Sequence, residues 1–98
     1  MKIIKEQNGT SLRIAPEGPL DTASVPELER ELKGSLDGIT DLTIDLCQVK
    51  YISSSGLGLL LTTQRTMTAR GTMKVIHVNE TIRDVFDATG FSAVLSIE

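Results

Sequence analysis

The chain has 98 residues, of which 40% are apolar and 23% charged, enough for one hydrophobic core. Its net charge of −3 argues against nucleic acid or an anionic membrane as the main partner, because both attract basic surfaces. A single cysteine excludes an intrachain disulfide and a multi-cysteine metal site, and a single histidine excludes a multi-histidine cluster. We therefore expect one domain over residues 1–98, with no metal and no cofactor.

The hydrophobic stretches are too short for a membrane span. The longest, Leu57–Leu61, is far below the roughly 20 residues that a transmembrane helix needs. The first residues, Met1–Glu6, contain no long apolar segment typical of a signal peptide. These features predict a cytoplasmic protein with no membrane partner.

The N-terminal residues predict an antiparallel hairpin. Ile3-Ile4 indicates a short first strand, and Asn8-Gly9 is a strong turn signal. Residues Ser11–Ala15 alternate polar and apolar side chains, which is typical of a strand with one buried face. The segment Pro16–Pro19 is expected to end that strand.

A first helix is predicted between this hairpin and residue 38. Ser24–Glu27 fits a capping box with Pro26 in the first turn, and Thr22 is an alternative cap. Gly34 and Gly38 mark the end of the helix. The apolar stripe has spacings of three and four residues and comprises Val25, Leu28, Leu32 and Leu36.

A strand and a second helix follow. Leu42–Leu46 predicts a strand with alternate residues buried, and Ile52 leads into a serine cluster that opens a helix extending to about Ala69. The second half of this helix holds four threonines, so packing must hold it together because β-branched residues favour helix weakly. Its expected core stripe is Leu57, Leu60 and Leu61.

The C-terminal third predicts a strand, a short helix and a last strand. Met73–Val78 is the strand, and Asn79 is expected to cap the helix. Gly90 is the expected left-handed stop, and Val94–Ile97 can form the last strand. The helix is expected to bury Ile82, Val85 and Phe86.

This order of elements predicts an α/β fold. Strand–helix–strand units form right-handed crossovers between parallel strands, whereas the N-terminal hairpin adds an antiparallel edge. We expect a mixed sheet of four to five strands, with three to four helices mainly on one face.

The serine cluster Ser53-Ser54-Ser55-Gly56 has two interpretations. The first turn of a helix presents free N–H groups and a positive dipole end, where a phosphate is stabilised. Alternatively, the cluster only caps the helix, for which one serine suffices.

Enzyme motifs do not fit this cluster. A nucleophile elbow needs glycine two residues before the serine, where Tyr51 or Ile52 stands. A phosphate-binding loop needs Gly-Lys-Ser/Thr, whereas Gly58 is followed by three leucines. Since no acid, base and nucleophile converge, we expect no catalytic residues.

Four other residues have structural interpretations. Asp21 is expected to be a turn or helix-start carboxylate, and Asp45 to point outward from its strand, where it is solvated or caps backbone N–H groups. Cys47 is expected to be a small buried residue, because no nearby base or cation is implied. His77 is expected to be a half-buried strand residue.

Two stretches together resemble one family. Asp45–Gly58, with its core Ile52-Ser53-Ser54-Ser55-Gly56-Leu57-Gly58, is similar to the signature of STAS domains, the family of bacterial anti-anti-sigma factors. Gly18-Pro19-Leu20-Asp21-Thr22 resembles the second landmark of that family, before the first helix. The resemblance extends over the whole chain in its order of elements and implies a STAS-like fold.

The resemblance also implies a function and a site. In such proteins the serine after an aspartate, here Ser54, is phosphorylated by a partner that is both anti-sigma factor and serine kinase. The unphosphorylated form binds that partner and frees the sigma factor, and a serine phosphatase can be a further partner. The residues implied in phosphorylation and partner contact are Asp21, Ser53, Ser54, Ser55, Gly56, Leu57 and Gly58.

One departure from the family signature affects this site. The family usually has aspartate where this chain has Ser53, which can cap the helix but carries no charge. Three consequences are open: the kinase accepts serine at this position, the regulatory serine is Ser53 or Ser55 in place of Ser54, or the domain no longer switches. Other functions compatible with the family are a STAS module with a phosphatase or scaffold partner and a domain that binds a nucleotide or lipid.

Overall fold

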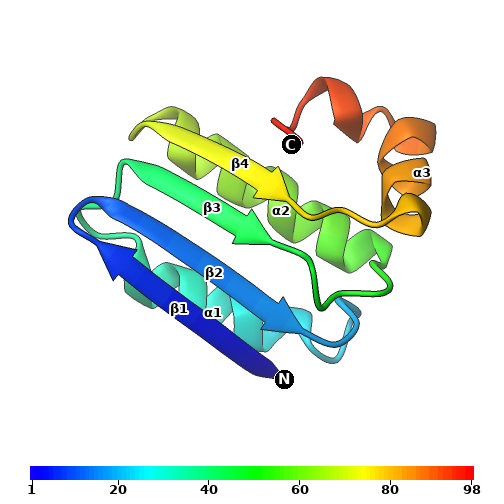
Figure 1. Ribbon diagram of the computed structural model, residues 1–98, viewed down its shortest axis with the longest axis horizontal. Helices are drawn as coiled ribbons and strands as arrows, with labels where there is room; N and C mark the ends of the chain where they lie inside the picture. The colour runs from blue at the N-terminus through cyan, green and yellow to red at the C-terminus, as the bar shows by residue number, and fades with distance from the viewer.

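The computed structural model describes all 98 residues as a mixed four-stranded sheet covered by helices (Figure 1). The sheet order is β1-β2-β3-β4, so each strand pairs with its neighbour in the sequence. The elements are β1 (Lys2–Asn8), β2 (Ser11–Glu17), α1 (Val25–Ser35), β3 (Asp41–Asp45), α2 (Ser54–Thr68), β4 (Thr72–Ile76), α3 (Glu80–Thr89) and a 3-10 turn η1 (Phe91–Ala93).

The predicted hairpin and the parallel crossovers are confirmed. β1 pairs antiparallel with β2 through a turn at Gly9, whose φ of 63° favours glycine. β2 pairs parallel with β3, and β3 with β4. Both hairpin strands are longer than expected: β1 pairs with β2 along its whole length, from Lys2 to Asn8, and β2 continues past Pro16 to Glu17.

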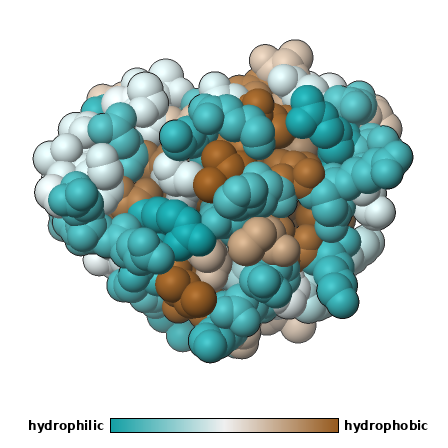
Figure 2. Space-filling model, viewed as in Figure 1, coloured by the Kyte–Doolittle hydropathy of each residue, from teal (hydrophilic) through white to brown (hydrophobic).

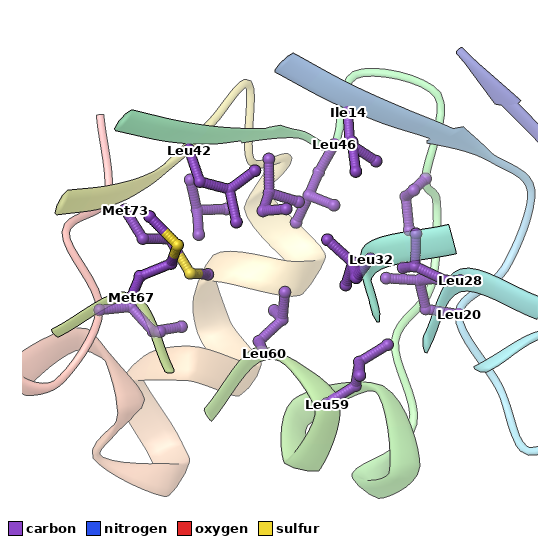
Figure 3. Packing of buried hydrophobic residues seen from close by; sticks show 14 of the residues in the cluster. Ile14, Leu20, Leu28, Leu32, Leu42, Leu46, Leu59, Leu60, Met67 and Met73 are labelled. Carbon is purple, nitrogen blue, oxygen red and sulfur yellow. The ribbon is translucent and has the colours of Figure 1, made fainter. Parts of the chain in front are cut away.

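Helices α1 and α2 cover one face of the sheet (Figure 1). The hydrophobic core lies between this face and the two helices. Figure 3 shows Ile14, Leu42 and Met73 of the strands facing Leu28, Leu60 and Met67 of the helices, and all six are buried. The opposite face is open and mostly hydrophilic, with a few apolar patches (Figure 2). None of the helices combines the length and the apolar character that crossing a membrane would require.

Helix α1 begins without the predicted capping box. Ser24 stands at the N-cap, but its backbone is in the helical region and its side chain caps no helix N–H. The Ser24 hydroxyl instead donates to the Pro19 carbonyl at 2.7 Å. The Asp21 carboxylate accepts from the backbone N–H groups of Ala23 and Ser24 at 3.1 and 3.0 Å. A turn centred on Asp21 therefore replaces the capping box.

The threonine hydroxyls of α2 bond back to carbonyl groups of their own helix. Each of the four hydroxyls donates to the carbonyl oxygen four residues earlier, at 2.8–3.2 Å. Thr63 is buried against the core, and the other three lie at or near the surface. These bonds satisfy the hydroxyls but do not stabilise the helix, so its buried face must hold it, as expected for a threonine-rich segment.

The C-terminal segment differs from the prediction in one respect. Asn79 caps α3 by accepting from Ile82 N–H at 2.8 Å, and Gly90 ends the helix with φ of 80°, both as predicted. The expected last strand is reduced to a single parallel bridge between Val75 and Ile97. After η1, Leu95 turns into the core, so only the residues that follow it reach β4.

Asp45 points outward from β3 and caps a backbone N–H as predicted, but it is buried and not solvated. Its side chain does leave β3 on the open face, but Arg13 and His77 cover it. One carboxylate oxygen accepts from the Arg13 guanidinium, and the other accepts from Cys47 N–H at 2.9 Å and contacts His77 Nδ1 at 2.9 Å. Burial would raise the pKa of Asp45, but these partners together hold that pKa well below its usual range.

Cys47 and His77 are also placed differently from the prediction. Cys47 is exposed just beyond β3, and the pKa of its thiol is raised because it faces the Asp45 carboxylate and is partly desolvated. His77 lies just beyond β4, exposed, with the left-handed φ of 57°. The predicted strand Met73–Val78 had included His77, but β4 ends at Ile76. Cys47 was predicted to be buried after its strand, but the loop beyond β3 leaves it exposed.

We predict that Asp45→Asn lowers the free energy of unfolding by about 2 kcal/mol at pH 7, because the partly buried Arg13 loses its buried charge partner and keeps only the exposed Glu6. The folded pKa lies below the unfolded value of about 3.9, so the contribution of Asp45 is complete above that value and is lost as the pH falls. Urea unfolding at several pH values should show the difference from wild type shrinking below about pH 4. The exposed Asp41→Asn on the same strand is the control, and a pH-independent difference would contradict the assignment.

We also predict opposite effects for two glycines of α2. A Cβ on Gly56 would lie 2.6 Å from Ile52 Cγ1 and 3.0 Å from the Leu20 carbonyl oxygen, so Gly56→Ala should cost about 1–3 kcal/mol. A Cβ on Gly58 meets nothing within 4 Å, so Gly58→Ala should stabilise the helix by about 0.5–1 kcal/mol. Thermal unfolding of both variants measures this contrast, and equal melting temperatures would count against the packing described.

Candidate functional site

Two loops at the carboxyl ends of β2 and β3 lie side by side and form the candidate site. Leu20 and Ile52 form a parallel bridge between the loops. Three backbone hydrogen bonds join them: Gly18 N–H to the Gln48 carbonyl at 2.9 Å, Leu20 N–H to the Tyr51 carbonyl at 3.0 Å, and Ser53 N–H to the Leu20 carbonyl at 2.8 Å. The two sequence landmarks, more than 20 residues apart, are therefore one structural unit.

Ser53 is the N-cap of α2. Its backbone is extended, with φ of −90° and ψ of 175°, and its hydroxyl oxygen accepts from Gly56 N–H at 3.4 Å. Its carbonyl oxygen accepts a hydrogen bond from Leu57 N–H at 3.0 Å, which closes the first turn of the helix. The capping interpretation of the cluster therefore applies to Ser53.

Ser54 is the first helical residue of α2 and is exposed. Its hydroxyl has no hydrogen-bond partner within the protein, so it is available from solvent. It lies where the unpaired N–H groups and the positive dipole end of the helix favour an anion. This position agrees with the prediction that the serine cluster opens the helix.

Ser55 differs from both of its neighbours. It is half-buried, and its hydroxyl lies 3.3 Å from the Thr22 hydroxyl on the adjoining loop. This contact links the start of α2 to the turn before α1. The three adjacent serines thus have three different environments: a cap, a free hydroxyl and an inter-loop contact.

The remaining predicted contact residues divide into exposed and buried positions. Gly58 is exposed, and Asp21 is half-buried with one carboxylate oxygen engaged by its own turn. Gly56 and Leu57 are buried, because α2 packs them against Ile52 and Leu20 and the core. These two residues position the site and offer almost no surface to a partner, which corrects their predicted role in contact.

Sequence reasoning missed Tyr51 as part of this surface. Tyr51 is 54% exposed in the loop that pairs with Leu20, two residues before the cap of α2. It is the only tyrosine of the chain, and large exposed aromatic side chains are enriched in protein interfaces. The sequence did contain a signal for Tyr51. It is an aromatic residue between Lys50 and Ile52, in a segment that was not predicted to be a strand or a helix.

Comparison with known proteins agrees with this arrangement. The family model for the STAS domain matches residues 2–98. The anti-sigma-B factor antagonist of Bacillus subtilis is 29% identical over 93 residues, which cover 94% of this chain and 85% of that protein. The anti-sigma-B factor antagonist of Staphylococcus epidermidis is 33% identical over 82 residues, covering 82% and 76%. These names describe regulatory proteins.

Solved structures share the fold at lower sequence identity. An anti-sigma factor antagonist from Mycobacterium paratuberculosis superposes with a TM-score of 0.88 at 22% identity, covering 98% of this chain and 83% of that one. The anti-sigma factor antagonist SpoIIAA in its unphosphorylated form superposes with a TM-score of 0.77 at 21% identity, covering 99% and 87%. By its family match, its strand order and the joining of both sequence landmarks at one edge of the sheet, this chain belongs to the STAS domain family.

Proposed function

We propose that this STAS domain is an anti-sigma factor antagonist whose binding is controlled by phosphorylation of Ser54. The observation that carries the proposal is the free, exposed Ser54 hydroxyl on the first turn of α2. The relatives named anti-sigma-B factor antagonist support an anti-sigma factor as the partner. In this role the protein is a substrate and a competitor, and it catalyses no reaction.

The position of Ser54 suits reversible phosphorylation. A phosphate carries a charge of about −1.5 to −2 at neutral pH, and the N-terminus of a helix stabilises such a charge. Because the Ser54 hydroxyl makes no internal hydrogen bond, its modification removes no contact within the protein. The domain can therefore keep its fold in both states.

The same charge would act strongly on a bound partner. A contact surface formed around Ser54, with Gly58, Tyr51 and the Asp21 turn at its sides, fits a hydroxyl in the unmodified protein. A phosphate would place an unmatched dianion in that contact, which costs several kcal/mol and lowers affinity by orders of magnitude. The switch needs no conformational change in the domain.

Ser53 is a weaker candidate for phosphorylation than Ser54. Its hydroxyl accepts a backbone hydrogen bond at the helix N-cap, and a phosphate there would disturb the cap. Ser55 is half-buried against Thr22. The family usually has an aspartate at the position of Ser53. Compared with that aspartate, Ser53 keeps the capping hydrogen bond but carries no negative charge. We place phosphorylation on Ser54, by an anti-sigma factor with serine kinase activity, with removal by a serine phosphatase.

We predict that Ser54→Asp keeps or slightly raises stability, by about 0.3–1 kcal/mol, because a carboxylate at a helix start interacts favourably with the dipole. The same variant should bind the anti-sigma factor at least tenfold more weakly, whereas Ser54→Ala should bind normally and resist phosphorylation. Thermal unfolding and a binding titration on the same three samples measure both effects.

The outcomes separate the possible roles of Ser54. Binding of Ser54→Asp at wild-type affinity would show that this position is not a charge switch. Unfolding of Ser54→Asp would show that the hydroxyl is structural after all. Recovery of the native complex from cells, followed by mass spectrometry of partners and phosphosites, identifies the anti-sigma factor independently.

We further predict that Ser53→Ala lowers the free energy of unfolding by about 0.5–2 kcal/mol, because Gly56 N–H loses its capping acceptor. Ser53→Asp should not lower it, since an aspartate supplies the same acceptor and a favourable charge. Urea unfolding compares the two variants. If Ser53→Ala were as stable as wild type, the N-cap assignment would be wrong and Ser53 would return as a candidate for phosphorylation.

A further inference from the structure

A second group of reactive side chains lies on the open face, at the carboxyl ends of β3 and β4. A carboxylate oxygen of Asp45, the thiol sulfur of Cys47 and a ring nitrogen of His77 all lie within 4.8 Å of one another. They come from the last residue of β3, the loop after it and the residue after β4. We propose that these three side chains bind a zinc-type divalent cation.

The carboxylate of Asp45 is held ready to act as a ligand. It is 1% exposed, and one of its oxygens accepts from two nitrogens of the Arg13 guanidinium. That bond turns the other oxygen toward His77 Nδ1, at 2.9 Å, and toward Cys47, whose N–H it accepts at 2.9 Å. Arg13 thus orients the Asp45 carboxylate without touching the ion itself, as residues hydrogen-bonded to ligands do in metal sites.

The other two ligands are open to solvent, so an ion can reach them. Cys47 is exposed, and the His77 side chain is 62% exposed. The backbone of His77 has φ of 57°, a conformation in which non-glycine residues are uncommon, and it brings the ring over Asp45. A strained residue beside exposed reactive groups is typical of a functional position.

The combination of oxygen, sulfur and nitrogen ligands selects the type of ion. Mg²⁺ and Ca²⁺ prefer oxygen ligands alone, whereas thiolate and imidazole favour Zn²⁺ and Co²⁺. Three protein ligands leave a fourth tetrahedral position for water, as in open zinc sites. With bonds of about 2.0–2.3 Å, ligand atoms lie about 3.5 Å apart. The ligand atoms here lie within 4.8 Å of one another, so the widest pair must close by roughly 1.3 Å at most. If His77 binds through Nδ1, its 2.9 Å contact with Asp45 must open by roughly 0.6 Å.

The charge balance of the site is acceptable. The Asp45 carboxylate and a Cys47 thiolate contribute −2 and Arg13 contributes +1, so a dication leaves a net charge of +1. On binding, the thiol proton passes to the buffer as the sulfur–metal bond forms. His77 Nδ1 donates its proton to the Asp45 carboxylate in the free site, so that proton moves to Nε2 if Nδ1 becomes the ligand. A bound ion would tie the loop after β3, which leads to the serines, to the residue after β4.

The composition of the chain did not reveal this site. With one cysteine and one histidine, no cluster of like ligands is possible, and no metal was expected. The mixed set arises only because β3 and β4 are parallel neighbours that end at the same edge of the sheet, so that residues 30 positions apart meet.

The test is titration of the whole chain with Co²⁺, followed by displacement with Zn²⁺. The expected result is one Co²⁺ per chain with an intense thiolate-to-cobalt charge-transfer band in the near ultraviolet. Cys47→Ser should abolish the band, and His77→Asn should weaken Co²⁺ binding at least tenfold. Both residues are exposed, and asparagine tolerates the left-handed backbone, so both variants should fold. Asp41→Asn, at the opposite end of β3, is the control and should leave binding unchanged.

A second measurement needs no variant. Zn²⁺ should slow the reaction of Cys47 in the wild-type protein with a thiol reagent, because the sulfur is coordinated. Absence of the charge-transfer band, an equal band in Cys47→Ser, or an unchanged thiol reaction rate in saturating Zn²⁺ would each overturn the proposal. None of these results bears on Ser54, so the phosphorylation proposal is tested separately.

Discussion

The close approach of two loops determines the geometry of the site. The loop after β2 and the loop after β3 are joined by three backbone hydrogen bonds around the Leu20–Ile52 bridge. Gly56 makes this approach possible, because a Cβ there would collide with the Leu20 carbonyl and with Ile52. The start of α2 is therefore fixed against the core on one side, while Ser54 remains exposed on the other.

This arrangement separates stability from recognition. The buried face of α2 supplies the packing, and the hydroxyls of its threonines satisfy carbonyls of their own helix. The first turn contributes exposed polar atoms that the core does not need. A charge added to this first turn changes the surface that a partner contacts and leaves the core unchanged. A switch by modification on a small rigid domain requires both properties.

The order and direction of the elements could be predicted from the sequence, because apolar periodicity and turn residues act locally. The Asn8-Gly9 turn, the Asn79 cap and the Gly90 stop are such local signals. Asp45 could not be placed in the same way. Periodicity gives the face on which its side chain lies, but its burial depends on Arg13 and His77, which come from other strands and their ends.

Sequence patterns also could not predict the roles of the three individual serines in the cluster. Three identical residues in a row offer no local signal that separates them, and the resemblance to a family points to one position only. Their environments separate once the helix start is fixed, because Ser53 caps, Ser55 meets Thr22 from the neighbouring loop, and Ser54 has no internal partner. The capping bond also explains why serine can stand where the family usually has aspartate: the helix needs an acceptor oxygen at that position, and a hydroxyl supplies one.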